Sequence, residues 1–278
     1  MYKFRKGDIV GRKSYNKDIL FAIEKIIKTK NGSFAILKGM SIRIEADAPL
    51  DDLELIEKNI IDNNLRSLET RLKKRIDNCF LNNSSFNKFN NKRLKEVIYT
   101  GKILHLDGDK KYSEKSARYY KQVGLNSIVR NISENRQPLV VKNLLNRYNP
   151  DILIITGHDG MIKNGTGFND IYNYRNSRHF INTVKVARES YSSNNELVIF
   201  AGACQSYYEA IMIAGANFAS SPERVLIDFL DPLIIAEKVA TTDKYKYLTI
   251  NDIAPELRDG TKGIGGIGAK GKKNIIFV

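Results

Sequence analysis

The sequence predicts an α/β protein in which a mostly parallel sheet, flanked by helices, follows a small β module. Short β-favouring runs separated by turn residues fill residues 1–56. From about residue 97 onward, strand-like and helix-like runs alternate, as they do in βαβ units. Two strand-like runs, Asp151–Thr156 and Glu196–Ala201, are rich in β-branched residues and stop at small residues. Such runs are typical of strands buried on both faces of a parallel sheet.

The first predicted unit, residues 1–56, is the β module. Turn-prone sequences such as Asn31-Gly32-Ser33 separate its strands. Strands this short and this closely spaced indicate an SH3-like barrel, a fold that usually binds or tethers. The predicted strands are Asp8–Arg12, Ile19–Ile27, Phe34–Lys38 and Ile42–Glu45.

The second unit, residues 57–96, is a basic connector. In its first half, apolar residues recur at helical spacing from Leu65 to Ile76. Its second half, 82–93, is rich in asparagine and lysine and has no periodicity, which predicts an exposed loop. Between them, Cys79 is expected to pack at the end of the helix rather than to react.

The third unit, residues 97–278, carries the alternating pattern. One predicted helix begins directly after Cys204, where a helix N-terminus would stabilise a thiolate, and further α/β elements follow to about residue 250. Besides the two apolar runs, the predicted strands are Lys102–Asp109 and Ser127–Ile132. The predicted helices are Glu114–Gln122, Leu139–Tyr148, 176–190 and Gln205–Ile213.

Composition limits the classes of protein that this chain can be. The chain has 278 residues, 42% of them hydrophobic, which is enough for a sizeable core. No apolar run reaches the roughly 20 residues that a membrane-spanning helix needs, and the first residues lack the apolar core of a signal peptide. We therefore expect a protein that stays inside the cell, with no membrane partner. In a reducing cytosol its two cysteines should not form a structural disulfide.

The formal net charge of +14 favours acidic partners such as nucleic acid. No zinc-finger spacing, recognition helix or aromatic-studded RNA-binding signature accompanies that charge, so we do not expect nucleic acid as the main partner. The alternative left open is a non-catalytic basic protein that binds nucleic acid or serves as an assembly scaffold. The histidines and cysteines show no spacing of a metal site. The glycine-rich run 263–273 lacks the following helix that a phosphate-binding loop needs, so we expect no cofactor.

A histidine and a cysteine follow the two apolar runs. His158 and Cys204 each come shortly after a predicted parallel strand. Because the carboxyl ends of such strands meet at one edge of the sheet, the two side chains should face one crevice. A thiol with a pKa of about 8.5 needs a base to become a nucleophile, and His158 can take its proton and later protonate the leaving amine. The pair therefore predicts a cysteine hydrolase.

Small residues around the pair support this reading. Backbone N–H groups near Gly160 and at Cys204 are predicted to form an oxyanion hole. Asp159 could orient the imidazole or face the substrate, and the sequence leaves both open. A buried cysteine alone is commonly inert, and a lone histidine commonly makes structural hydrogen bonds. Their occurrence together at two strand ends favours catalysis.

The two strand-end motifs resemble known peptidases. Thr156-Gly157-His158-Asp159-Gly160 and Ala201-Gly202-Ala203-Cys204 resemble the caspase, clostripain and gingipain group, in which strands end in His-Gly and Ala-Cys. The departures are Asp159, which stands between His158 and Gly160, and Gly202 in place of a glutamine. This resemblance implies a caspase-like sheet for residues 97–278.

A closer resemblance covers nearly the whole chain. Lys6–Tyr15, the strand-end motifs, Tyr207–Ala210 and Gly215–Pro222 resemble the YabG family of sporulation-specific proteases. The resemblance implies Cys204 as nucleophile, His158 as its partner and Asp159 in the site. It also implies that spore coat and cortex-associated proteins are the substrates, in the mother-cell cytoplasm at the forming coat.

Peptidases of the caspase, clostripain and gingipain group often prefer a basic residue before the scissile bond, so the resemblance implies cleavage after Arg, or after Lys. A carboxylate should then pair with that residue. Asp107 and Asp109 are the candidates, with Asp228 or Asp231 as a second choice, although each could merely cap a helix or fill a turn. Exposed basic residues of the connector, around Arg71–Arg75 and Lys92–Lys95, would also permit self-cleavage.

Overall fold

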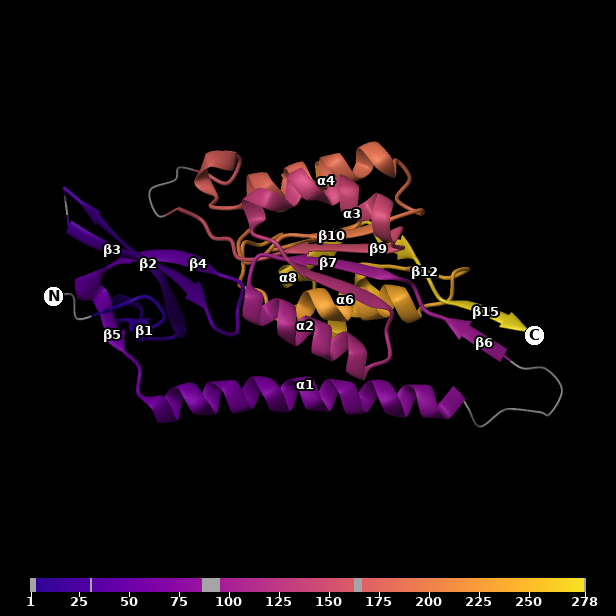
Figure 1. The fold of residues 1–278 in the computed structure, drawn as a ribbon, viewed down its shortest axis with the longest axis horizontal. Helices are drawn as coiled ribbons and strands as arrows, with labels where there is room; N and C mark the ends of the chain where they lie inside the picture. Colours follow the sequence, from indigo (N-terminus) through magenta and orange to yellow (C-terminus); the bar gives the residue numbers. More distant parts are fainter. Residues whose placement is uncertain (1–3, 31, 87–95, 163–166, 278) are drawn as a thin grey trace.

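The computed structural model describes residues 4–30, 32–86, 96–162 and 167–277. They form an antiparallel β module at one end, a long helix, and a larger α/β unit (Figure 1). None of the helices in these ranges combines the length and apolar character needed to cross a membrane.

The β module is a five-stranded antiparallel sheet with the strand order β4-β3-β2-β1-β5. Buried apolar side chains such as Val10, Phe21 and Leu37 hold it together. The predicted β character of this segment is confirmed. The strands are β1 (Ile9–Arg12), β2 (Phe21–Thr29), β3 (Gly32–Gly39), β4 (Glu45–Pro49) and β5 (Leu53–Leu55).

The predicted strand at Ile42–Glu45 is wrong, because β4 starts only at Glu45. The residues before it, Met40–Ile44, form the loop between β3 and β4. Two residues of this loop make isolated bridges to Asp228 and Asp159 of the α/β unit. The β-favouring run therefore also pairs outside its own sheet.

Helix α1 (Lys58–Phe86) runs along the length of the molecule, outside helix α2 (Figure 1). Leu68 is buried on the side that faces the core, as the helical spacing predicts. The predicted loop over 82–93 is wrong for residues 82–86, which continue the helix. Its remainder lies outside the described residues.

The α/β unit is built on a six-stranded sheet with the strand order β13-β11-β10-β9-β7-β8. All neighbours are parallel except β11 and β13, so the predicted mostly parallel sheet is confirmed. The strands are β7 (Ile103–Asp107), β8 (Ser127–Asn131), β9 (Ile152–Thr156), β10 (Val198–Ala201), β11 (Phe218–Ser220) and β13 (Ile264–Gly266).

Helices cover both faces of this sheet: α3 and α4 lie on one face, and α2 and α6 on the other (Figure 1). Two apolar clusters fill the two interfaces. The helices are α2 (Lys110–Gln122), α3 (Gln137–Tyr148), α4 (Ser177–Ser190), α5 (Tyr208–Ile213), α6 (Asp231–Thr241), α7 (Ile250–Ile253) and α8 (Gly260–Gly263). Two short antiparallel pairs complete the fold: β6 (Glu96–Tyr99) with β15 (Asn274–Phe277), and β12 (Tyr247–Leu248) with β14 (Ala269–Lys270).

The prediction of a helix starting directly after Cys204 is wrong. Gln205 has a left-handed backbone conformation, with φ of 55°, which cannot open a right-handed helix. Helix α5 starts only at Tyr208. No helix N-terminus therefore lies directly at the thiol.

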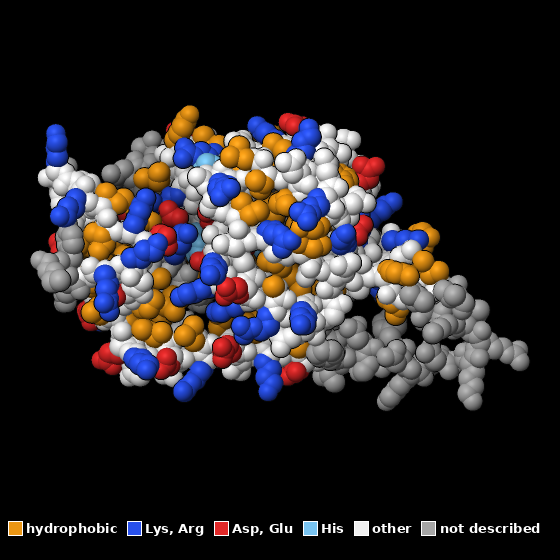
Figure 2. All heavy atoms as spheres, viewed as in Figure 1, with side chains coloured by type: hydrophobic (Ala, Val, Ile, Leu, Met, Phe, Trp, Pro, Cys, Tyr) orange, Lys and Arg blue, Asp and Glu red, His pale blue; other side chains and the backbone are white. Residues whose placement is uncertain are grey.

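Lys and Arg side chains do not gather into one stripe on the face shown in Figure 2. They are spread over the face, with carboxylates and exposed apolar side chains among them. On this face, the distribution differs from the clustered basic surface that typifies nucleic-acid-binding proteins.

Candidate active site

His158 and Cys204 follow neighbouring strands at the same edge of the parallel sheet. β9 and β10 pair in parallel, with Ile155 opposite Ala201. Each strand stops a few residues before its functional residue, so both side chains stand on loops at the carboxyl ends of the strands. Both side chains are fully buried.

One carbonyl oxygen joins the two loops. The carbonyl of Arg43, in the β3–β4 loop, accepts hydrogen bonds from the N–H of Cys204 at 3.2 Å and from the N–H of Asp159 at 3.1 Å. The N–H groups of Cys204 and Asp159 thus point at a single oxygen atom. Among the described residues, the Cys204 thiol and the His158 ring share no hydrogen bond with each other.

The Cys204 thiol is neutral in this arrangement. Its sulfur accepts from the N–H of Ile227 at 3.2 Å. That bond favours the thiolate, but burial outweighs it and raises the pKa of Cys204 to about 12. A base must therefore take the thiol proton before the sulfur can attack a carbonyl carbon.

The His158 ring is held between the β module and the start of α2. It stacks on the Tyr112 ring, with centroids 5.4 Å apart, and its Nε2 lies 3.4 Å from the carbonyl oxygen of Gly39. Its Nδ1 lies 3.9 Å from a carboxylate oxygen of Asp109. Burial is the main cause that lowers the pKa of His158, to about 4, so the imidazole is neutral at pH 7.

Asp159 fixes the loop that carries His158. Its carboxylate accepts from the hydroxyls of Ser177 and Ser206 and from the N–H groups of Gly160 and Asn176. Burial raises its pKa to about 6 in spite of these bonds. The predicted Gly160 N–H is therefore bonded to this carboxylate, whereas the N–H of Asp159 itself faces the shared carbonyl.

Asp107 forms a buried ion pair with Arg43. The guanidinium Nη1 lies 3.0 Å from the Asp107 carboxylate, and both side chains are fully buried. The guanidinium carbon lies 4.8 Å from the Tyr112 ring centre and 5.5 Å from that of Phe229. Burial opposes ionisation of Asp107, but the Arg43 charge prevails and its pKa is lowered.

The other predicted carboxylates have different neighbours. Asp109 caps α2 by accepting from the N–H of Tyr112 at 3.0 Å, and its second oxygen faces His158. Asp228 pairs with Arg71 of α1. Asp231 accepts from the N–H of Asp228, and burial raises its pKa to about 7.

Sequence reasoning missed four residues around the site: Arg43, Tyr112, Glu134 and Phe229. Glu134 is buried and accepts from the N–H of His158 at 2.8 Å. A side chain at Gly157 would collide with Glu134. The glycine could therefore have indicated that another residue lies close to the backbone at this position. Arg43 and Phe229 stand in segments far from either motif, and no local pattern singles them out.

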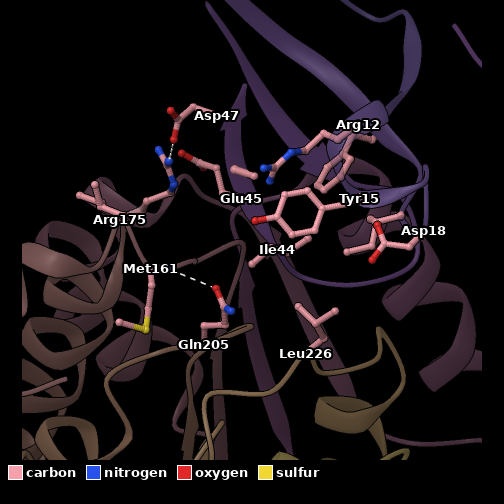
Figure 3. Close-up of a pocket in the computed structure, with 14 residues that line it drawn as sticks. Arg12, Tyr15, Asp18, Ile44, Glu45, Asp47, Met161, Arg175, Gln205 and Leu226 are labelled. Atoms are coloured by element: carbon pink, nitrogen blue, oxygen red, sulfur yellow. Dashed lines mark hydrogen bonds and ion pairs between the residues drawn. The ribbon is translucent and has the colours of Figure 1, made fainter. Parts of the chain in front are cut away.

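A pocket of about 430 Å³ adjoins the site, between the β module and loops of the α/β unit (Figure 3). Ile44 and Gln205, which follow Arg43 and Cys204 in the chain, both line it. The pocket is therefore lined in part by residues that follow Arg43 in the chain, and not by Arg43 itself. Arg175 and Asp47 form an ion pair on its wall, and the N–H of Met161 donates to Gln205.

The predicted self-cleavage region is not an exposed extended segment where it is described. Arg71 and Arg75 lie on helix α1, and Arg75 pairs with Glu237 and Glu256. A peptidase binds substrate as an extended strand, so these arginines are poorly presented. Lys92–Lys95 lie outside the described residues.

A family model and a known protein match nearly the whole chain. Residues 5–277 match the family described as YabG peptidase U57. A Bacillus subtilis (strain 168) protein described as "Sporulation-specific protease YabG" is 37% identical over 288 residues, which cover 98% of this chain and 97% of that protein. No solved structure is significantly similar. The similarity thus extends over the β module, the connector and the α/β unit together.

Proposed function

The chain belongs to the YabG peptidase U57 family, and from this membership we propose that it is a cysteine endopeptidase acting in sporulation, with Cys204 as nucleophile and His158 as general acid and base. The proposal rests most on one observation. The N–H groups of Cys204 and Asp159 converge on a single peptide carbonyl oxygen. Such a pair of donors stabilises the oxyanion of acyl transfer, at about 2.7–4 kcal/mol for each donor.

The proposed reaction proceeds through a thioester. His158 takes the thiol proton, and the sulfur attacks a carbonyl carbon whose oxygen lies between the two N–H groups. The imidazole then protonates the leaving amine, and water hydrolyses the thioester. Asp109 acts as a positioning residue, because its carboxylate faces Nδ1 of His158. Asp159 positions the loop through its four hydrogen bonds.

We propose that the enzyme cleaves after arginine and that Asp107 selects it. The Asp107 carboxylate is buried and already pairs with a guanidinium, that of Arg43, which lies over the Tyr112 and Phe229 rings. A planar guanidinium pairs with the carboxylate and stacks on the rings, which an ammonium does less well. Arginine should therefore be preferred to lysine. Asp109, the other candidate, faces His158 instead.

The biological setting is carried over from the family. The B. subtilis relative is a sporulation-specific protease by its description. We propose spore coat and cortex-associated proteins as substrates, in the mother cell at the forming coat, and the chain itself as a further substrate. We also propose an SH3-like module at 1–56, a connector at 57–96 and a caspase-like unit at 97–278.

Peptide hydrolysis by matched variants tests this function. Wild type should cleave peptides after Arg, whereas Cys204→Ala and His158→Ala should be inactive. Cys79→Ala is the control for loss of a cysteine and should keep full activity. With coat proteins as substrates, mass spectrometry should locate the cuts after Arg. Undiminished activity of Cys204→Ala would refute the proposal.

A further inference from the structure

We propose that the β3–β4 loop occupies the substrate cleft as an intramolecular substrate, and that the chain cuts itself between Arg43 and Ile44. This inference rests on the proposed function and adds the bond that is cut. It follows from where the loop lies: residues Met40–Ile44 leave the β module and cross the edge of the parallel sheet at His158 and Cys204.

The loop backbone binds as an extended substrate would. On the side before the bond, Ile42 forms an antiparallel bridge with Asp228, and the N–H of Phe229 donates to the carbonyl of Ser41 at 3.3 Å. Addition of a peptide as an extra strand is a general mode of recognition.

On the other side of the bond, Ile44 forms a parallel bridge with Asp159, whose carbonyl accepts from the N–H of Glu45 at 2.7 Å. The peptide is thus held on both sides. Between these contacts, the Arg43 carbonyl receives the two N–H groups that would stabilise an oxyanion.

The side chain of Arg43 fills the position expected for the residue before the scissile bond. It is fully buried, and its carboxylate partner, Asp107, comes from the α/β unit and not from its own module. Its Nε and Nη2 have no hydrogen-bond partner among the described residues. An arginine buried with so few partners is costly for a purely structural contact. Its carbonyl oxygen, which accepts from the N–H of Cys204, supports a role as substrate.

The chemical step balances without any further reagent than water. The Cys204 sulfur bonds to the carbonyl carbon of Arg43, and the thiol proton passes to His158. The bond from that carbon to the Ile44 nitrogen breaks, and the nitrogen takes the proton. Water then hydrolyses the thioester, which leaves a carboxylate at Arg43, an amine at Ile44 and the free thiol.

The two products should stay together after the cut. The segment up to Arg43 carries β1, β2 and β3, whereas the segment from Ile44 carries β4 and β5. The β3–β4 and β1–β5 ladders join the two segments. Cleavage should therefore be invisible by native gel filtration and visible only after denaturation.

Intact-mass spectrometry of denatured protein tests the inference. Wild type should yield one fragment ending at Arg43 and one starting at Ile44, at a rate independent of protein concentration. Cys204→Ala should stay whole. Arg43→Gln should lose this cut, whereas Arg5→Gln, which changes an exposed arginine of the same module, should keep it. Arg43→Lys keeps the positive charge and should therefore fold. Its 43–44 bond should be cut at least about tenfold more slowly than in wild type.

A parallel assay with an external arginine peptide separates the two proposals. If wild type hydrolyses the peptide but leaves the 43–44 bond intact, or cuts itself only elsewhere, this inference is overturned and the peptidase function stands. A self-cleavage rate that rises with protein concentration overturns the intramolecular step. If neither the peptide nor the chain is cut, both proposals fail.

Discussion

The guanidinium of Arg43 and the carboxylate of Asp107 lie 3.0 Å apart, and neither is exposed to solvent. The two residues belong to different units, one to the β3–β4 loop and the other to the end of β7. Their contact links substrate selection to the stability of the resting protein, and four predictions follow from it and from the groups around it.

Asp107→Asn should remove the preference for arginine. The carboxamide cannot neutralise a buried guanidinium, and the loss of one partner of a buried pair costs about 3–5 kcal/mol. We expect kcat/KM for an arginine peptide to fall about 100-fold or more. The matched control is Asp77→Asn, which changes an exposed aspartate of α1 and should have no effect. Unchanged turnover in Asp107→Asn would exclude this carboxylate as the specificity residue.

The same pair should govern stability in an inactive background. In Cys204→Ala protein, Asp107→Asn leaves the buried Arg43 charge unpaired and should lower the free energy of unfolding by about 3–5 kcal/mol. Adding Arg43→Met removes that charge and should restore most of the loss. Urea denaturation measures both variants. If the Arg43→Met change gives no recovery, the two side chains are not coupled in solution.

His158 should make stability depend on pH. Its pKa in the folded protein is lowered to about 4, against about 6.5 in an unfolded chain. Between these values the unfolded state binds a proton that the folded state does not, so stability falls as the pH is lowered through this window. In the Cys204→Ala background, His158→Gln should flatten this dependence by up to about 1.4 kcal/mol per pH unit. Equal slopes in urea unfolding would contradict the lowered pKa.

The loop should control the reactivity of Cys204. In a His158→Gln chain, which should remain uncut, iodoacetamide should modify Cys204 slowly, because the thiol is buried and its pKa is raised to about 12. Adding Arg43→Ala should loosen the loop and speed alkylation at least about tenfold. Peptide mapping measures the rate, with Cys79 as the internal reference. Equal rates with and without Arg43 would mean that the loop does not cover the thiol.

Several features were predictable because they depend on local patterns. The runs before His158 and Cys204 are apolar and β-branched, so they indicated buried parallel strands, and β9 and β10 are indeed neighbours. Membership of the YabG family was also recognisable from motifs, and the comparisons confirm it.

Other features had misleading local signals. The residues after Cys204 have helical propensity, yet Gln205 adopts a left-handed conformation and α5 begins later. The run at Ile42–Glu45 has β propensity, yet β4 begins only at Glu45, and Ile42 and Ile44 form bridges to loops of the α/β unit. In each case a contact distant in sequence determined the local structure.

By itself, the sequence determined the parallel sheet and the family, because burial on both faces of a strand restricts which residues can occupy it. Only the tertiary structure decided that Arg43 lies between the His158 and Cys204 loops, with its side chain on Asp107. Local periodicity does not encode which loop fills a cleft, since that choice depends on shape and charge brought together from distant segments.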